Sequence, residues 1–464
     1  YCNATYKTSI AFKNFREGKG ERFQYPFGVS VKNDDSFMYY YLKHLYPNMY
    51  PPEEGARFFN RQTLIAESGK FTDGEIKGTN FNHDIDAAYH FDAALFGQFL
   101  KEKIAIPNGV SHFYDKISYC TKDEKGNIKA IHTDKGESFS ADLFIDCTGF
   151  KSLLLEKFME VPFISFKDFL FNDTALVTPV PYIDKENQMK NYTDCVALGN
   201  GWVWETPLWH RIGTGYVFSS RHTTIENAER EYREHLSSTY SDEIGKDAEF
   251  RKINIKHGKH THSWKNNVVA VGLSYGFIEP LESTGLLTTH ENIIQLAKIL
   301  DMSESFITQK WIDKFNFNID KLMDGMMMFV AYHYYLSQRK DTKYWEDCVN
   351  NLDIYHNSCQ SNNGLFKKHL EETITFFYDT SNGFLWDFAN TDRIDLVYIA
   401  MGQGISPISK FNFLNDISNN ENLIEGIEQF HKHWQKERKD LLKELDKLPT
   451  HFEFLKNNIY GRNS

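Results

Sequence analysis

The stretch 268–285, VVAVGLSYGFIEPLESTG, constrains the fold of this chain more than any other. Its first four residues are apolar and predict a short buried strand. Gly272 ends that run at a point where the missing side chain lets a ligand approach the backbone closely. Gly276, Pro280 and Gly285 then indicate a tight loop. The stretch therefore predicts a strand that leads into a loop near a binding site.

A helix follows the loop, because apolar residues recur there at the spacing of one helix face, namely Leu286, Ile293, Ala297 and Leu300. Ser283 and Thr284 are N-cap candidates for it. The amides and the positive dipole end of such a helix favour an anion near Thr284 and Gly285. Glu282 lies at the same edge as a candidate acid, base or charge-stabilising group. An ordinary strand-to-helix connection without a ligand is the alternative.

Composition limits the class of protein. With 464 residues the chain is long enough for two or three domains, and 41% hydrophobic with 25% charged residues indicates a globular protein. No run of about 18 apolar residues predicts a membrane span. The net charge of -11 disfavours nucleic acid as a partner. Six cysteines without CxxC spacing argue against a zinc site or a disulfide framework and suit a reducing cytoplasm.

A second strand end is a candidate cofactor site. In ADLFIDCTGF, residues 143–145 predict a buried strand that stops at Asp146 and Gly149. Nucleotide cofactors of α/β proteins tend to lie at the carboxyl ends of such strands. Alternating residues before it, from 117 to 132, predict a hairpin or meander.

Other elements follow from periodicity. The spacing of apolar residues in segment 80–100 predicts one helix, and Pro107 to Gly109 would end it. Apolar residues at helical spacing from Leu423 to Leu448 predict an amphipathic helix over the body of the protein. The spacing of His257, His260 and His262 fits neither a helical histidine pair nor a zincin pattern, so no metal site is expected.

Several segments together resemble flavin-dependent halogenases of the tryptophan halogenase family. The loop text GFIEPLESTG is similar to the family segment that packs against the isoalloxazine ring, and its first half is shared more loosely by flavin monooxygenases. DCTGF at 146–150 resembles the family's DCSGF. GWVWETP at 201–207 resembles its GWxWxIP signature, with Thr206 in place of isoleucine. ATYKTSIAFKNF at 4–15 is similar to the segment that carries the family's catalytic lysine, here Lys7. The likeness extends to about Leu455.

The resemblance implies an α/β, flavin-monooxygenase-like FAD-binding fold with a mainly helical C-terminal region. Residues 1–300 would form an N-terminally truncated flavin-binding and substrate-sheet region. Residues 301–464 would form a mostly helical region that closes over the substrate site. In the motif YHYYLSQRKDTKYW, the resemblance implies that Arg339, Asp341 and Trp345 order a helix end.

The resemblance also implies roles for individual residues. Lys7 and Glu282 would be catalytic, and Thr284 and Gly285 would bind the halide with their amides. The residues implied in FAD binding are Val110, Asp146, Thr148, Gly149, Gly272, Leu273, Phe277, Pro280 and Leu286.

The implied reaction uses FAD in its reduced form, delivered by a separate flavin reductase. A flavin hydroperoxide would oxidise the halide ion to hypohalous acid, which travels to Lys7. The lysine would form a haloamine or polarise the acid by hydrogen bonding. Glu282 would stabilise the cationic intermediate or take its proton. The substrate would be a small electron-rich aromatic compound of the indole or phenol type. Two alternatives remain open: a flavin-dependent aromatic hydroxylase, and a degenerate non-catalytic flavoprotein that serves as a binding module.

The sequence departs from the family pattern at one point. The family begins with a strand, a GxGxxG turn and a helix that holds the FAD pyrophosphate. The glycines at Gly18 and Gly402 do not match this motif in sequence or context. Since Tyr1 is not methionine and lies six residues before Lys7, we expect an incomplete N-terminus. The chain as written is predicted to bind FAD poorly.

Overall fold

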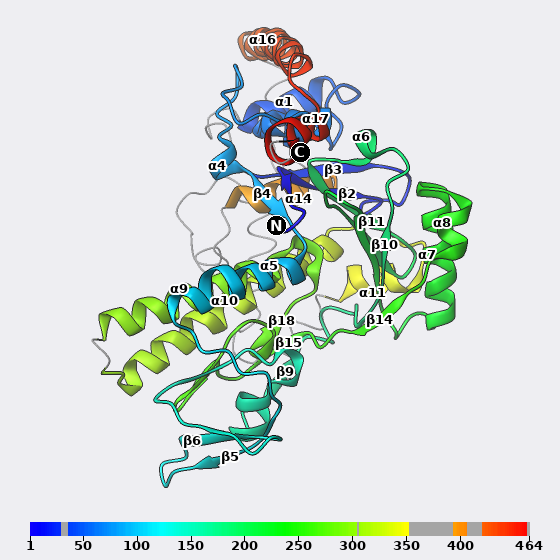
Figure 1. Ribbon diagram of the computed structural model, residues 1–464. Helices are drawn as coiled ribbons and strands as arrows, with labels where there is room; N and C mark the ends of the chain where they lie inside the picture. Colours follow the sequence, from blue (N-terminus) through cyan, green and yellow to red (C-terminus); the bar gives the residue numbers. More distant parts are fainter. Residues whose placement is uncertain (29–35, 304–305, 352–392, 406–419, 462–464) are drawn as a thin grey trace.

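The computed structural model describes residues 1–28, 36–303, 306–351, 393–405 and 420–461 (Figure 1). Its largest sheet has seven strands, in the spatial order β14 (Arg251–Asn254), β10 (Thr174–Val180), β13 (Ile212–Phe218), β12 (Gly201–Pro207), β11 (Tyr192–Ala197), β2 (Ser9–Lys13) and β3 (Arg22–Pro26). All neighbours pair antiparallel except β11 and β2, which run parallel with Cys195 opposite Phe12. Beyond residue 301 the described part of the chain is helical, so the fold is mixed α/β as predicted.

Three smaller sheets carry the segments that the sequence singled out. They are β8 (Phe144–Asp146), β17 (Val268–Ala270) and β16 (Trp264–Lys265); β9 (Phe163–Ser165), β15 (Gly258–His260) and β18 (Gly276–Phe277); and β5 (Ile117–Lys122), β6 (Ile128–Thr133) and β7 (Ser138–Phe139). The predicted strands at 143–145 and 268–271 are confirmed, and they pair parallel with Asp146 opposite Ala270. Both strand ends therefore meet at one edge. The predicted meander is confirmed as β5, β6 and β7.

The prediction of one helix over 80–100 is wrong. The structure has a short helix α4 (His83–Asp86), a strand β4 (Ala88–His90) and a helix α5 (Ala93–Phe99). The strand pairs antiparallel with β1 (Thr5–Lys7), a contact across about 80 residues that local periodicity cannot reveal. Asp92 then starts α5 by accepting hydrogen bonds from the Ala94 and Leu95 amides, so a cap divides the apolar pattern.

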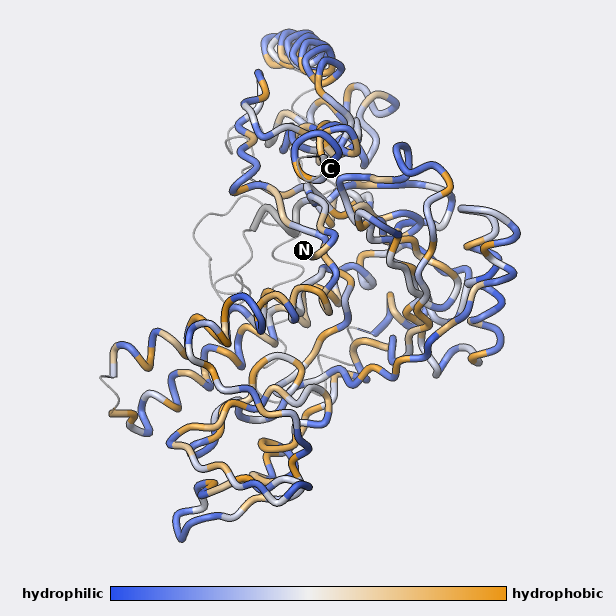
Figure 2. The backbone as a smooth tube through the Cα atoms, viewed as in Figure 1, coloured by the Kyte–Doolittle hydropathy of each residue, from blue (hydrophilic) through white to orange (hydrophobic). Residues whose placement is uncertain are grey.

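Long helices dominate the second half of the described chain. Helices α9 (Thr284–Met302) and α10 (Gln309–Tyr335) lie side by side (Figure 1). The remaining helices of four or more residues within the described ranges, the π-helical turns aside, are α1 (Ser36–Leu45), α2 (Glu54–Phe59), α3 (Gln62–Ser68), α6 (Lys185–Gln188), α7 (Ile225–Thr239), α8 (Asp242–Asp247), α11 (Lys343–Asn350), α14 (Arg393–Gly402), α16 (Glu421–Asp446) and α17 (His451–Leu455). The predicted amphipathic helix is confirmed as α16, which packs on α1 and α3. Hydrophilic and hydrophobic colours alternate along it in Figure 2.

The buried face of α9 differs from the predicted one. Thr284, Thr288 and Asn292 point inward, whereas Leu286 and Ile293 are 55% and 49% exposed. Of these polar side chains, Thr288 has a local partner, because its hydroxyl donates to the Gly285 carbonyl at 3.1 Å. The apolar side of α9 is therefore left as surface, a feature typical of binding sites.

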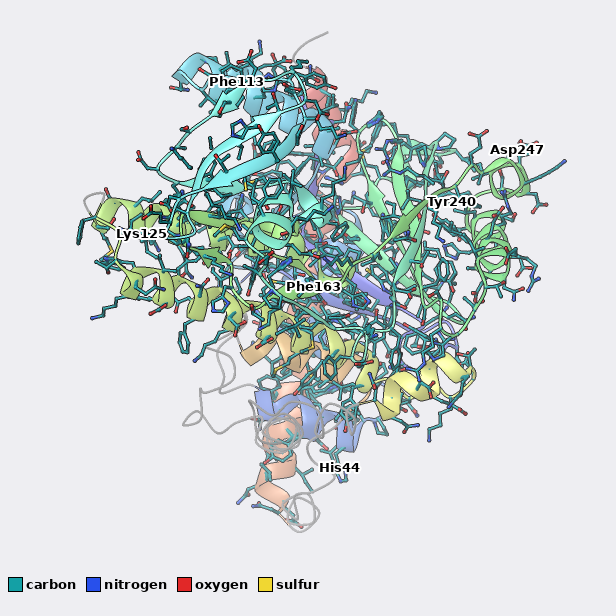
Figure 3. All side chains as sticks on the ribbon, turned by 90° about the horizontal axis from the view of Figure 1, so that it is seen from below. His44, Phe113, Lys125, Phe163, Tyr240 and Asp247 are labelled. Carbon is teal, nitrogen blue, oxygen red and sulfur yellow. The ribbon has the colours of Figure 1, made fainter. Side chains whose placement is uncertain are left out.

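One hydrophobic core joins the large sheet to the helices. It includes Ile10 and Phe12 of β2, Met326 and Val330 of α10, and Ala400 of α14. Figure 3 shows the hairpin turn at Lys125 and the end of α8 at Asp247 on opposite sides of the molecule. Among the described helices, none combines the length and the apolar character that a membrane crossing requires.

Candidate active site

Lys7 is buried at the end of strand β1. The residue is 4% exposed, and its Nζ donates a hydrogen bond of 2.9 Å to the Ser283 hydroxyl. Nζ also lies 5.3 Å from the centre of the Phe27 ring. The structure therefore brings the predicted lysine directly against the 268–285 stretch, 276 residues away in sequence.

Burial changes the acidity of Lys7. It lowers the pKa of the lysine to about 8, and the nearby Cys195 and Glu282 side chains oppose part of that shift. The ammonium and the free amine are consequently both populated near pH 8. A buried lysine with this property can act as a hydrogen-bond donor or as a nucleophile.

The helix α9 begins without a side-chain cap. Ser283 is its N-cap residue, but the residue adopts the left-handed conformation with φ of 57° and makes no capping hydrogen bond. Its hydroxyl instead accepts from Lys7. Thr284, the other predicted cap, is already the first helical residue. The start of this 19-residue helix therefore keeps amides available for an anion beside the lysine.

The two glutamates of the loop contact consecutive residues of α10. Glu282 Oε1 lies 2.5 Å from His333 Nε2, and both side chains are almost fully buried. Glu279 is fully buried and accepts hydrogen bonds from Tyr334 and, at 3.0 Å, from the Asn172 amide. Helix α10 thus packs against both carboxylates and donates a hydrogen bond to Glu279, and of the two only Glu282 interacts electrostatically with Lys7.

Asp146 holds the turn at the end of β8. Its buried carboxylate accepts from the amide and the hydroxyl of Thr148 at 2.9 and 2.7 Å, and from the Leu154 and Leu155 amides at 2.7 and 2.9 Å. These bonds account for the buried position of an acidic side chain. They also hold Thr148 and Gly149 in place at the edge where β8 and β17 end.

The surface around these strand ends fits a flat, largely apolar ring system. Leu273 and Leu286 are 42% and 55% exposed. Gly149 and Gly272 are left-handed, with φ of 69° and 63°, and no atom lies within 4 Å of a Cβ built on Gly149. Open backbone beside exposed apolar side chains is what a flavin ring requires. Val110, the other exposed residue of the predicted set, is 56% exposed.

The predicted helix-end residues also come together. Arg339 donates to both carboxylate oxygens of Asp341, at 2.9 and 2.7 Å, and its guanidinium lies 4.5 Å from the centre of the Trp345 ring. No group of three or more histidine, cysteine or acidic side chains in the described residues is arranged to hold a metal ion.

Comparison with known proteins identifies the family. The tryptophan halogenase family matches residues 1–416 of the chain. The chain belongs to this family. Tryptophan 7-halogenase RebH of Lentzea aerocolonigenes is 32% identical over 413 residues, which cover 82% of this chain and 75% of RebH. Tryptophan 6-halogenase SttH of Streptomyces toxytricini is 33% identical over 367 residues, which cover 75% of this chain and 68% of SttH.

Solved structures agree with this assignment. The VirX1 apo structure has a TM-score of 0.89 and 44% identity, with 99% of this chain and 87% of that chain covered. The crystal structure of SttH has a TM-score of 0.81 and 28% identity, with 98% and 86% covered. The chain is therefore a flavin-dependent halogenase, an enzyme that uses FADH2 and a halide ion. Of the three functions that the sequence left open, the family selects the halogenase over the hydroxylase and the non-catalytic module.

Sequence reasoning missed His333. The residue stands in the motif YHYYLSQRKDTKYW, which drew attention only to residues near its end. A histidine within an otherwise apolar stretch of a buried helix could have served as the signal, because such a side chain needs a polar partner.

Proposed function

We propose that this halogenase transfers a halogen to a small electron-rich aromatic compound of the indole or phenol type, with Lys7 as the relay and Glu282 as the charge-stabilising group. The observation that carries the proposal is the hydrogen bond from buried Lys7 to Ser283, between Glu282 and the start of α9. The names of the relatives make tryptophan one candidate substrate. A separate flavin reductase is the proposed source of FADH2, and the scattered cysteines support a cytoplasmic location.

The flavin would lie on the surface formed by the loop and the neighbouring strand end. When bound in its reduced form, the flavin would supply the activation of molecular oxygen that is needed to oxidise the halide. Within this proposal the glycines at 149 and 272 admit the ring, and Leu273, Phe277 and Leu286 cover its apolar parts. Pro280 fixes the backbone between Phe277 and Glu282, because its φ angle is restricted. Val110 and the turn held by Asp146 and Thr148 complete the proposed set.

The halide site is proposed at the amides of Thr284 and Gly285. These amides lie at the start of the long helix α9. The side chain of its N-cap residue, Ser283, accepts a hydrogen bond from Lys7 and makes none to the helix amides. A positive dipole end with free amides favours a small anion. Hypohalous acid formed there would be close to Lys7, because Ser283, the residue before Thr284, is hydrogen-bonded to the lysine.

Lys7 and Glu282 divide the remaining chemistry. As an amine, Lys7 would take the halogen from hypohalous acid to form a haloamine, with loss of one N–H proton and release of water. As an ammonium, it would donate a hydrogen bond that polarises hypohalous acid. The lowered pKa of about 8 supports either role at neutral to mildly alkaline pH. Glu282 is buried next to Lys7, so its charge would stabilise a cationic ring intermediate in a site that excludes water. Burial of both groups keeps water away from the oxidant.

Replacing Lys7 tests the proposal. The Lys7→Ala variant is incubated with excess FAD, a flavin reductase, NADH, bromide and a panel of indoles and phenols. We expect it to consume reduced flavin at the rate of the unmodified protein while no product with a bromine isotope doublet forms in mass spectrometry. Lys13→Ala is the matched control, because Lys13 is a partly exposed lysine at the far end of the next strand. Normal halogenation by Lys7→Ala would rule out the lysine relay.

A further inference from the structure

His90 is buried between the strand that carries Lys7 and the large sheet. The residue ends β4, where its backbone pairs with that of Thr5 on β1. Its Nδ1 lies 3.2 Å from the Thr5 hydroxyl oxygen, and its Nε2 lies 2.8 Å from the hydroxyl oxygen of Thr193 on β11. The imidazole therefore bridges β1 and β11 through two buried threonine side chains.

The Thr5 hydroxyl determines the direction of these hydrogen bonds. It donates its single proton to the Pro207 carbonyl at 2.6 Å, so it can only accept from His90. Nδ1 of the imidazole must then carry a proton. In the neutral ring Nε2 is unprotonated and accepts from the Thr193 hydroxyl. One chain of three hydrogen bonds thus runs from β11 through His90 and Thr5 to the end of β12.

The surroundings keep the imidazole neutral. Burial lowers the pKa of His90 well below its ordinary value of 6.5, and Lys7 and His451 act in the same direction, whereas the Pro207 carbonyl opposes the shift. A neutral ring has one donor and one acceptor, which are the groups that the two threonines require. The Nδ1–H tautomer is therefore the form of His90 at neutral pH.

Lys7 depends on this bridge because β1 has little backbone support. Strands β1 and β4 form a two-stranded sheet with three residues in each strand, and so small a sheet is at best marginally stable by itself. Thr5 and Lys7 are two residues apart on β1, so their side chains leave the strand on the same side. The side of β1 that His90 holds is thus the side from which Lys7 donates to the Ser283 hydroxyl at 2.9 Å.

We propose that His90 is a positioning residue for halogen transfer, which as the Nδ1–H tautomer ties β1 to the large sheet and so holds Lys7 against Ser283. The inference rests on the proposed function, because the position of Lys7 matters to the reaction only if this lysine is the relay. His90 keeps its proton throughout and adds no chemical step. Without the bridge, Lys7 would be displaced from Ser283, and hypohalous acid would escape to water before the lysine could direct it.

Nitrogen-15 NMR tests the bridge without FAD or substrate. In the unmodified protein at pH 7, His90 should show a protonated Nδ1 and an unprotonated Nε2, and Lys7 should titrate with a pKa of about 8. In His90→Phe and in Thr193→Val, Lys7 should gain access to water, so its pKa should rise toward the ordinary value of 10.5. Thr178→Val is the matched control, because Thr178 is a buried threonine on β10 of the same sheet. It should leave the pKa of Lys7 unchanged.

The yield of halogenated product per reduced flavin tests the role in the reaction. The variants are incubated with excess FAD, a flavin reductase, NADH, bromide and the indoles and phenols, and a β-diketone traps free hypobromous acid in parallel samples. We expect this yield to fall by about tenfold in His90→Phe, which removes two hydrogen bonds, and by about threefold in Thr193→Val, which removes one. Trapped hypobromous acid should rise while consumption of reduced flavin stays the same. Thr178→Val should behave as the unmodified protein does.

The outcomes separate the bridge from the proposed function. A protonated Nε2 of His90 in the unmodified protein, or an unchanged pKa of Lys7 in Thr193→Val, would overturn the proposal even if His90→Phe fails to fold. A normal product yield in a variant with a shifted Lys7 pKa would overturn the effect on the reaction. Absence of any halogenated product from the unmodified protein, with the expected NMR results, would instead contradict the proposed function.

Discussion

At the scale of single residues, Glu279 makes a pH-dependent contribution to stability. Burial raises the pKa of this carboxyl to about 7, although hydrogen bonds from Tyr334 and Asn172 oppose the shift. The unfolded chain loses the proton near pH 4.5, and the folded protein loses it only near pH 7. Ionisation in this window therefore favours unfolding. The stability that the protonated acid contributes is complete below pH 4.5 and is lost by about 3 kcal/mol as pH rises through 7.

The Glu279→Gln variant removes this titration while it keeps the shape of the side chain. Relative to the unmodified protein, its free energy of unfolding should rise by about 2 to 3 kcal/mol between pH 5 and pH 8. Urea unfolding at both pH values measures the difference. Parallel stability curves for the two proteins would show that Glu279 is ionised in the folded state. Asn172→Asp is not a suitable control, because it places a second acid beside the first.

The residue scale also shows what the sequence could predict about the site. Lys7 and Glu282 were identified because both stand inside distinctive segments, although no local pattern places them together. Their proximity depends on β1 lying next to the loop after β17, and residue spacing carries no such information. His333 was not identified for the same reason: its contact with Glu282 exists only where α10 crosses that loop.

At the scale of elements, strand β13 is shaped by the tryptophans of β12. Trp204 pairs with Gly215, and a Cβ built on that glycine would lie 2.2 Å from the indole ring. The indole ring is rigid, and its centre lies 6.2 Å from that of the Trp202 ring, which packs beside it. Gly215→Ala should therefore destabilise the protein by about 1 to 3 kcal/mol, the cost of overpacking. Thermal or urea unfolding of the variant measures this change.

Gly213 provides the control for that prediction on the same strand. A Cβ there would lie 3.2 Å from the end of the Arg211 side chain, which is flexible and can move, and 3.8 Å from the Thr206 carbonyl, an ordinary van der Waals distance. Gly213→Ala should change the free energy of unfolding by well under 1 kcal/mol, as is usual for accommodated surface substitutions. Equal effects of the two substitutions would mean that backbone flexibility, and not the indole ring, requires glycine in β13.

Element predictions succeeded where the signal was local and failed where the partner was distant. The strands β8 and β17 were predicted correctly, because short apolar runs bounded by glycine or polar residues are informative by themselves. Strand β4 was taken for helix, since its pairing partner β1 lies about 80 residues away. The inward face of α9 was also misjudged. Thr288 can face inward because its hydroxyl donates to a carbonyl of the same helix, a contact that the apolar pattern does not reveal.

At the scale of the whole molecule, the two ends of the described chain support each other beside the site. The N and C marks lie close together in Figure 1, and the Tyr460 hydroxyl donates to the Ala4 carbonyl at 2.7 Å. The amide of Tyr6 donates to His451 Nε2 at 3.1 Å. Strand β1, which carries Lys7, is thus held by helix α17. A contact between residues 445 apart is beyond any sequence pattern.

This support depends on a neutral His451. Burial lowers the pKa of the histidine to about 4, below its ordinary value near 6.5. Nδ1 faces the Met189 carbonyl at 3.2 Å, so Nε2 must stay unprotonated to accept from Tyr6. Because the folded pKa is depressed, the stabilisation is complete above pH 6.5. It is lost as pH falls through 4, by about 3 kcal/mol in total.

Acid should therefore loosen strand β1 before it unfolds the large sheet. We expect amide exchange at Tyr6 to accelerate, relative to exchange in β12 and β13, as pH falls from 6.5 to 4, after correction for the intrinsic pH dependence of exchange. In His451→Gln, which does not titrate in this window, the relative rate should be independent of pH. The His451 contribution to stability increases with pH, whereas the Glu279 contribution decreases with pH. The two variants therefore separate contributions to the free energy of unfolding that oppose each other in the unmodified protein. A relative exchange rate at Tyr6 that is constant with pH in the unmodified protein would mean that the chain after α17 holds the start of β1 through the contact of Tyr460 with Ala4, and not through His451.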